Sequence, residues 1–173
     1  NGTVRIWSAN TGAPANPLNM GDVTPLVLGL AFSPSGAEVA VATLFGDVLV
    51  FERTTGTVRY ALRGHSGSVN AVAFSQDGTL LASADEDGQI MIWEVATGNM
   101  LKQFGAHAGQ IFGLEFTATQ LASLGSDRVV KFWDIGTWQE ALVVADATSV
   151  GKDLTIDASG QRLAVGGADG VAR

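Results

Sequence analysis

An aromatic residue recurs along this chain at a nearly constant interval. Four segments of alternating apolar residues each end on tryptophan or phenylalanine, at Trp7, Phe51, Trp93 and Trp133. The successive spacings are 44, 42 and 40 residues. A period in this range indicates one supersecondary unit copied along the chain, and such a unit buries its apolar faces only against neighbouring copies. The repetition therefore constrains the fold more strongly than any other feature.

Each period carries the signals of four short strands. The aromatic residue ends one strand, and a turn follows five residues later, with glycine at Gly12, Gly56 and Gly98 and a tryptophan, Trp138, in the fourth repeat. The apolar runs that complete the repeats are 26–32 and 39–43, 69–74 and 80–84, 111–116 and 120–124, and 150–156 and 162–165. These runs are short, are separated by turn sequences and lack a helical period, which predicts an all-β chain of antiparallel sheets.

Four-stranded antiparallel sheets repeated at this period are typical of a β-propeller, in which blades pack radially and cover both faces of one another. We predict one propeller segment over residues 1–173. Its approximate repeats are 1–20 (outer strands only), 21–62, 63–104, 105–145 and 146–173 (inner strands only). About four blades that start and stop at the same phase favour part of a larger ring; a ring of eight blades from two copies and a closed four-bladed ring are the alternatives. Asn1 begins within a repeat, which predicts that the natural start lies upstream.

Composition excludes several classes of protein. A chain of 173 residues with 46% hydrophobic and 16% charged residues has ample material for a packed core. Its apolar runs are too short to cross a membrane as helices. A net charge of −7, with the basic residues spread singly, disfavours binding to nucleic acid. The absence of cysteine excludes disulfides and thiolate metal sites. No signal peptide is recognised, and the predicted location is cytoplasmic.

Two repeats carry a denser motif than the others. One contains Gly64-His65, Leu81-Ala-Ser83, Asp87-Gly88 and Trp93-Glu94, and the next contains Gly105-Ala-His107, Leu121-Ala-Ser123, Asp127 and Trp133-Asp134. The chain resembles the WD-repeat β-propeller family over its whole length, with two well-matched and two degenerate repeats. The repeat that ends at Phe51 departs from the pattern, with Val41 and Phe45 where the family favours serine and aspartate.

The residue types His65, Ser83 and Asp87 are also those of a catalytic triad. The same set occurs twice at matching offsets from a tryptophan, which favours a structural role over one nucleophilic site. The resemblance implies a hydrogen-bonded tetrad inside each of two blades: His65, Ser83, Asp87 and Trp93, and His107, Ser123, Asp127 and Trp133. We expect loss of Asp87 to leave His65 unpaired at a cost of about 1–3 kcal/mol. In the degenerate repeats, apolar packing must take the place of the tetrad.

Other sequence segments resemble metal-binding or phosphate-binding motifs but lack residues that those motifs require. The acidic stretch 85–88 begins like a calcium loop, but Gln89, Ile90 and Ala96 stand where further ligands, or glycine, are required. The glycine-bearing segments 150–152 and 166–170 lack a full phosphate cradle. Each histidine has an expected internal partner, which disfavours a shared zinc ion. We predict no metal and no cofactor.

The resemblance implies a platform at one end of the ring. Its surface consists of the loops that lead into the innermost strand and the turns that join the second and third strands. The candidate partner-binding residues are Phe45, Glu86, Ser126 and Arg128 in or beside those turns, Ser66, Ser68 and Gln110 in the leading loops, and Trp138. For Phe45, burial in the space of the missing tetrad is favoured over an exposed anchor. For Trp138, a packed edge residue and an exposed anchor stay open.

The predicted function is a non-catalytic protein-interaction scaffold or ligand-sensing module within a larger multidomain protein. Its partner would be a protein or peptide, with no nucleic acid and no membrane. One alternative is a propeller hydrolase or lyase, which converging carboxylates at the channel mouth would favour. The other is an oligomerising fragment that builds a ring from two copies, by self-association of an incomplete ring.

Overall fold

The computed structural model describes residues 4–20, 26–145, 151–157, 159–168, 170 and 172. The elements in these ranges are β-strands, in three four-stranded antiparallel sheets and one two-stranded sheet. Blade 1 comprises β1 (Val27–Phe32), β2 (Glu38–Thr43), β3 (Val48–Glu52) and β4 (Val58–Leu62). Blade 2 comprises β5 (Val69–Phe74), β6 (Leu80–Asp85), β7 (Gln89–Glu94) and β8 (Met100–Gly105). Blade 3 comprises β9 (Ile111–Phe116), β10 (Gln120–Gly125), β11 (Val129–Asp134) and β12 (Glu140–Ala145).

Two shorter units flank the three blades. At the C-terminal end, β13 (Gly151–Ile156) pairs with β14 (Leu163–Gly167), and we call this pair the C-terminal half blade. Near the other end, residues 4–18 form two extended segments, joined by hydrogen bonds from Leu18 N–H to Val4 O and from Ala15 N–H to Ile6 O. We call these residues the N-terminal half blade. Positions 1–3, 21–25 and 146–150 of the predicted repeats lie outside the described residues.

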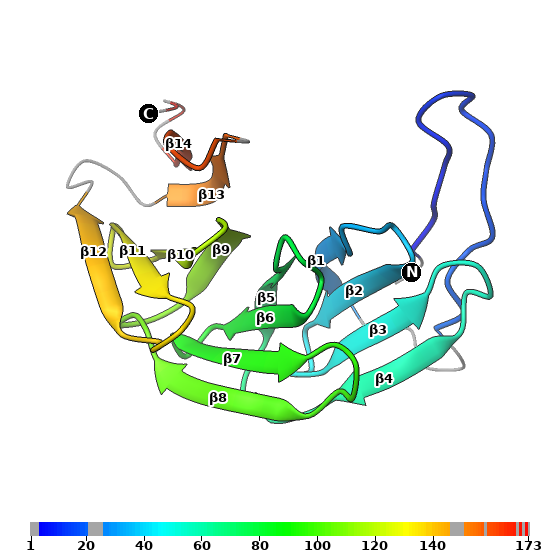
Figure 1. Cartoon of the computed structure of the whole chain (residues 1–173), viewed down its shortest axis with the longest axis horizontal. Helices are drawn as coiled ribbons and strands as arrows, with labels where there is room; N and C mark the ends of the chain where they lie inside the picture. Colours follow the sequence, from blue (N-terminus) through cyan, green and yellow to red (C-terminus); the bar gives the residue numbers. More distant parts are fainter. Residues whose placement is uncertain are drawn as a thin grey trace.

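The blades stand side by side along an open arc (Figure 1). The first strands β1, β5, β9 and β13 lie on its concave side, each in contact with the next, and β4, β8 and β12 lie on its convex side. Within every blade the strand order follows the sequence. The predicted all-β propeller of four-stranded blades is confirmed, with strand bounds within one or two residues of the apolar runs.

The core lies between blades. In β2, Ala40 and Ala42 pack against blade 2, whereas Val39 and Val41 pack against the N-terminal half blade. Every residue of β2 is therefore buried. Because both faces of a blade are covered, the central strands need no polar side, which explains their unbroken apolar sequences.

Blade 1 is held by apolar packing where a tetrad would otherwise lie. Val41 and Phe51 are both 0% exposed and pack with Val4 and Leu18 of the N-terminal half blade. The nearby Thr43 hydroxyl donates to the carbonyl of Asp47 at 2.8 Å and so closes the turn between β2 and β3. This blade keeps the strand order of the others without a tetrad.

Candidate functional site

In blade 3 the structure brings together the four residues that the sequence assigned to a tetrad. His107 lies in the loop that leads into β9, with Nδ1 3.0 Å from each carboxylate oxygen of Asp127. Its Nε2 lies 2.7 Å from Ser123 Oγ. The indole Nε1–H of Trp133 donates to the same Ser123 oxygen at 2.8 Å. The leading loop is thus tied to the second and third strands of its own blade.

In blade 2 the tetrad forms with a different acid. His65 Nε2 lies 2.7 Å from Ser83 Oγ, which also accepts the indole N–H of Trp93 at 2.8 Å. However, His65 Nδ1 lies 2.7 Å from Asp85, not Asp87. Asp87 is exposed and accepts a hydrogen bond from Ser66 Oγ at 2.9 Å. The predicted pairing of Asp87 with His65 is therefore wrong, and Asp85 takes that role.

The reason lies in the residue two positions after each tetrad serine. In blade 3 this residue is Gly125, and a Cβ atom there would overlap both the His107 ring and the Asp127 carboxylate. In blade 2 the same position is Asp85, whose own side chain occupies that space and reaches the histidine. Its other oxygen accepts the N–H groups of Asp87 and Gln89, at 3.0 and 2.9 Å. The sequence carried a signal of this difference. Two positions after the tetrad serine, blade 2 has aspartate and blade 3 has glycine.

Both histidines are neutral members of complete networks. Burial lowers the pKa of His65 and of His107 below the ordinary value of 6.5, although hydrogen bonds and charge from the carboxylates oppose the shift. A neutral ring with Nδ1–H donating to the carboxylate and Nε2 accepting from serine satisfies every polar group. Ser83 and Ser123 are each 0% exposed, so neither hydroxyl can reach a substrate. Each tetrad therefore stabilises its own blade.

The loops at the tetrad end of the blades form a continuous surface, which we call the loop face. It comprises the leading loops 63–68 and 106–110 and the turns 44–47, 86–88 and 126–128. Gly46 has φ of 85°, and a Cβ atom there would lie 2.9 Å from His65 O. The second-to-third strand turn of blade 1 therefore lies directly against the leading loop of blade 2.

Several predicted partner-binding residues hold this surface together. The buried Ser68 donates its backbone N–H to Glu86 Oε1 at 3.1 Å, and Ser66 binds Asp87 as described above. In blade 3, Ser126 N–H donates to Gln110 O at 2.7 Å. Arg128 is exposed at a positive φ of 68°. These contacts fix the shape of the loop face, on which Glu86 and Arg128 are exposed residues.

Phe45 departs from expectation. It is 71% exposed, so the prediction that it is buried in the space of the missing tetrad is wrong. Val41 and Phe51 fill that space with residues of the N-terminal half blade. Phe45 instead lies beside exposed Leu44, whose N–H donates to the carbonyl of exposed Leu26 at 2.9 Å. We call Leu26, Leu44 and Phe45 the apolar patch.

Trp138 is a packed edge residue. It is partly buried and its ring lies 6.3 Å from that of Phe104 in blade 2. Its φ of 56° is the left-handed conformation that Gly56 and Gly98 adopt at the matching turns. Packing against the neighbouring blade holds a tryptophan in a backbone conformation suited to glycine.

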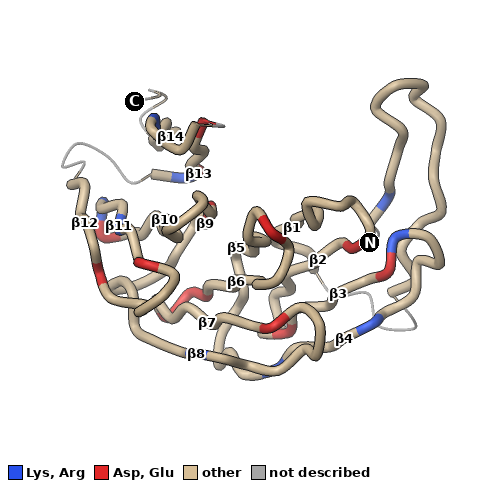
Figure 2. The backbone as a smooth tube through the Cα atoms, in the orientation of Figure 1, with Lys and Arg blue, Asp and Glu red and all other residues tan. Residues whose placement is uncertain are grey.

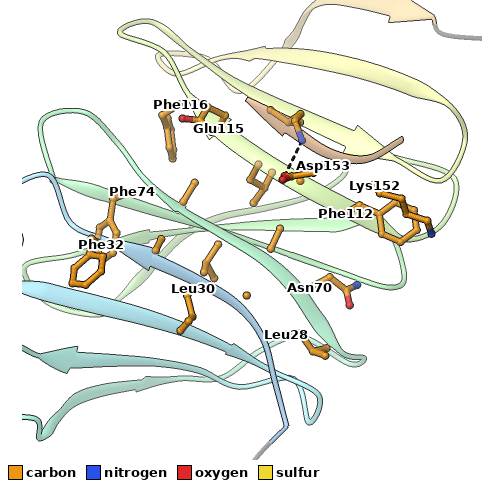
Figure 3. A pocket seen from close by; sticks show the side chains of 18 residues that line it. Leu28, Leu30, Phe32, Asn70, Phe74, Phe112, Glu115, Phe116, Lys152 and Asp153 are labelled. Carbon is orange, nitrogen blue, oxygen red and sulfur yellow. Dashed lines mark hydrogen bonds between the residues drawn. The ribbon is translucent and has the colours of Figure 1, made fainter. Parts of the chain in front are cut away.

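The concave side of the arc bounds a cavity of about 530 Å³, lined by β1, β5, β9 and β13 (Figure 3). At its wall, Lys152 Nζ lies 4.2 Å from the centre of the Phe112 ring. Burial, and secondarily the charge of Asp153, raise the pKa of Glu115. Asn70 Nδ2 is buried without a hydrogen-bond partner. Glu115 and Asp153 are the carboxylates among the residues that line this cavity.

Neither a metal centre nor a membrane span is indicated by the described residues. They contain no group of three or more histidine, aspartate or glutamate side chains arranged to hold a metal ion. Nor do the described ranges include a helix long and apolar enough to cross a bilayer. Acidic and basic residues are scattered along the arc rather than gathered on one surface (Figure 2).

Comparison with known proteins places the chain among propellers. The family model of the Vps8 β-propeller matches residues 20–134. The structure of U3-55K is 24% identical with a TM-score of 0.81, over 89% of this chain and 50% of that one. The crystal structure of the RRP9 WD40 repeats is 24% identical with a TM-score of 0.80, over 88% of this chain and 48% of that one.

The solved structures resemble this chain in fold. It spans about half the length of the two solved structures, and at this identity they show the fold alone. No curated protein sequence matches it. The resemblance to WD-repeat propellers is confirmed by the family match and the shared fold. Since the family model covers well over half of its residues, this protein belongs to the Vps8 β-propeller family.

Proposed function

We propose that this protein is a non-catalytic interaction scaffold whose protein or peptide partners dock on the loop face, with Phe45 as the main anchor. The observation that carries the proposal is the 71% exposure of Phe45 in a turn that is itself well fixed. Large aromatic side chains contribute disproportionately to binding when a partner covers them.

The turn that carries Phe45 is held on both sides. Thr43 closes its base through the carbonyl of Asp47, and Gly46 lies against the carbonyl of His65. His65 is in turn fixed by the blade 2 tetrad. A partner that binds Phe45 therefore loses little entropy in ordering this turn, which favours affinity.

The loop face carries exposed side chains of both charges. The leading loop of blade 2 separates Phe45 from the exposed acids Glu86 and Asp87. Arg128 is exposed on the next turn along the loop face. This mixture of charges gives selectivity among partners without strong attraction to a polyanion.

The buried state of the serines and histidines supports a binding role over catalysis. Ser83 and Ser123 are fully buried, and each accompanying histidine uses both ring nitrogens within its tetrad. The cavity on the concave side presents one carboxylate pair, Glu115 and Asp153, among mainly apolar residues. An enzyme would need an accessible acid–base group placed beside a substrate. The half-length match to solved propellers further supports a place within a larger protein.

A peptide library displayed on phage tests this proposal directly. Peptides selected on the 173-residue chain should bind a Phe45→Ala variant at least about tenfold more weakly, since loss of an aromatic anchor removes about 1.4 kcal/mol or more. Met100→Ala is the matched control, because Met100 is 50% exposed at the opposite end of blade 2. If selected peptides bind both variants like the parent, or if no peptide is enriched, the loop face is not the binding surface.

A further inference from the structure

The leading loop of blade 2 is fixed to its sheet through one buried side chain. Residues 63, 64 and 66 are exposed and position 67 is glycine, whereas the His65 side chain is 1% exposed. His65 binds Asp85 through Nδ1 and Ser83 through Nε2, both in β6. Glycine at positions 64 and 67 lets the backbone on both sides of the histidine rearrange. The position of this loop therefore depends on His65.

Other contacts of the loop lie at the surface. The Ser66 hydroxyl binds exposed Asp87 at 2.9 Å, and Arg63 Nε lies 3.5 Å from Asp47 Oδ1 with side chains 77% and 36% exposed. Exposed pairs of this kind contribute about 1 kcal/mol or less. The strands of blade 2 are held instead by apolar clusters shared with blades 1 and 3. The loop can therefore open while the blade stays folded.

The blade 2 tetrad is complete only with a neutral His65. In the neutral ring, Nε2 accepts the hydroxyl hydrogen of Ser83, whose oxygen accepts the indole N–H of Trp93. A protonated ring donates at Nε2 as well, so the Ser83 hydroxyl loses its acceptor. Ser83 is 0% exposed, and water cannot replace that acceptor while the loop is closed. Protonation therefore favours an open loop, in which the ring reaches water.

Burial and charge act on His65 in opposite directions. Burial is the larger influence and lowers the pKa of the ring below 6.5, whereas Asp85 favours the protonated form. In an open loop the ring takes its ordinary pKa, so each pH unit below 6.5 multiplies the open population by up to about ten. The other charged residues that border the loop are Glu86 and Asp87 on the turn of the same blade, Arg63 on the loop itself and Asp47 on the turn of blade 1.

The matching loop of blade 3 has further attachments. Ala106 is 3% exposed, and the N–H groups of Ala106 and His107 donate to the carbonyl of Gly88 at 2.8 and 3.2 Å. Burial and the charge of Lys131 lower the pKa of His107, while Asp127 opposes the shift. We therefore expect the loop 106–110 to stay closed at the pH at which the loop 63–68 opens.

The turn that carries Phe45 rests on the loop of blade 2. A Cβ atom at Gly46 would lie 2.9 Å from the carbonyl oxygen of His65 and 3.2 Å from that of Gly67. Because glycine has no side chain, the turn and the loop meet backbone against backbone. Opening of the loop removes this support, and a partner bound at Phe45 must then order the turn at a cost in affinity.

We propose that the leading loop 63–68 opens in mild acid and that the loop face then releases its partner. Partner release rests on the proposed function, whereas opening of the loop does not. The chain contains two histidines, so variants at His65 and His107 account for every imidazole that titrates in this range.

Hydrogen exchange tests the opening of the loop directly. After correction for the intrinsic effect of pH, the Ser68 amide should exchange about fivefold faster or more at about pH 5.5 than at about pH 7.5. Amides of the paired strands β5–β8 should keep their protection. His65→Gln cannot take up the proton, so its loop should exchange equally at both pH values. His107→Gln is the matched control and should open in acid like the parent.

Three results of this experiment would overturn the proposal. The first is equal exchange of the parent loop at both pH values. The second is opening in acid that persists in His65→Gln. The third is loss of protection in the strands of blade 2 together with the loop, because the whole blade would then unfold.

Partner release is measured with a histidine-free peptide that is selected at neutral pH and requires Phe45 for binding. Between about pH 7.5 and about pH 5.5, its affinity for the parent and for His107→Gln should fall about threefold or more, since only the closed loop supports the turn. Its affinity for His65→Gln should not change with pH. Equal binding to the parent at both pH values would overturn partner release. Absence of any Phe45-dependent peptide would overturn the proposed function and partner release with it, while the exchange experiment would still decide whether the loop opens.

Discussion

Gly125 in blade 3 and Asp85 in blade 2 occupy the same position, two residues after the tetrad serine, and they determine which acid pairs with the histidine. At Gly125 the missing side chain leaves room for the His107 ring and the Asp127 carboxylate to meet. At Asp85 the side chain itself binds His65 Nδ1 at 2.7 Å and is 0% exposed. The residue at this position thus determines which carboxylate accepts the hydrogen bond from the histidine, while the histidine, serine and tryptophan keep their contacts.

Removal of Asp85 should destabilise blade 2 more than removal of Asp87. Asp85→Ala leaves the buried His65 Nδ1 and two backbone N–H groups without their acceptor, so the free energy of unfolding should fall by about 1–3 kcal/mol. Asp87→Ala removes one exposed hydrogen bond from Ser66 and should change stability by about 0.5 kcal/mol or less. Urea denaturation of the two variants measures the difference. Equal losses would show that His65 does not depend on Asp85.

A methyl group at position 125 should disturb the blade 3 tetrad. Gly125→Ala places a Cβ atom into the His107 ring and the Asp127 carboxylate, and overpacking of this kind costs about 1–3 kcal/mol. Because the clash is shared with Asp127, the double variant Gly125→Ala, Asp127→Ala should be more stable than the sum of the single losses predicts. A double-mutant cycle by chemical denaturation gives this coupling. Strict additivity would mean that the two positions do not compete for space.

The buried histidines predict a loss of stability in mild acid. Burial lowers the pKa of His65 and His107 in the folded chain, so below pH 6.5 the unfolded chain binds more protons than the folded one. The free energy of unfolding should therefore be constant above about pH 7 and fall as the pH decreases through 6.5. Thermal melts between pH 5 and pH 8 measure this dependence.

A variant without the histidines isolates this effect from other titrating groups. His65→Gln, His107→Gln should be less stable at neutral pH, but its stability should change less between pH 7 and pH 5.5 than that of the parent. An unchanged slope in this variant would assign the acid sensitivity to carboxylates instead.

Two phenylalanines of blade 1 should respond oppositely to truncation. Phe51 is 0% exposed, and Phe51→Ala should lower the free energy of unfolding by about 3–5 kcal/mol, because its ring packs in the apolar cluster between blade 1 and the N-terminal half blade. Phe45 is 71% exposed, and Phe45→Ala should change stability by about 0.5 kcal/mol or less. Calorimetry of the two variants compares the same chemical change at a buried and an exposed site. A large loss in Phe45→Ala would indicate that its ring supports the fold.

Much of the fold followed from the repeat. The spaced aromatic residues and alternating apolar runs predicted four-stranded blades, and the observed strands lie within one or two residues of those runs. The tetrad of blade 3 was assigned in full, because its residues match the family pattern at every position. In blade 2 the pattern pointed to Asp87, since matching by offset ignores what a neighbouring side chain does to the available space.

The sequence by itself determined the period, the strand alternation and the identity of the residues that can form buried polar networks, because these depend on local spacing along the chain. Only the tertiary structure decided that Asp85 binds His65, that Phe45 faces solvent and that Trp138 packs on Phe104. Those outcomes depend on contacts across a few ångströms between residues distant in sequence. Whether a side chain is covered is set by the neighbouring blade, and the repeat pattern of one blade carries no information about it.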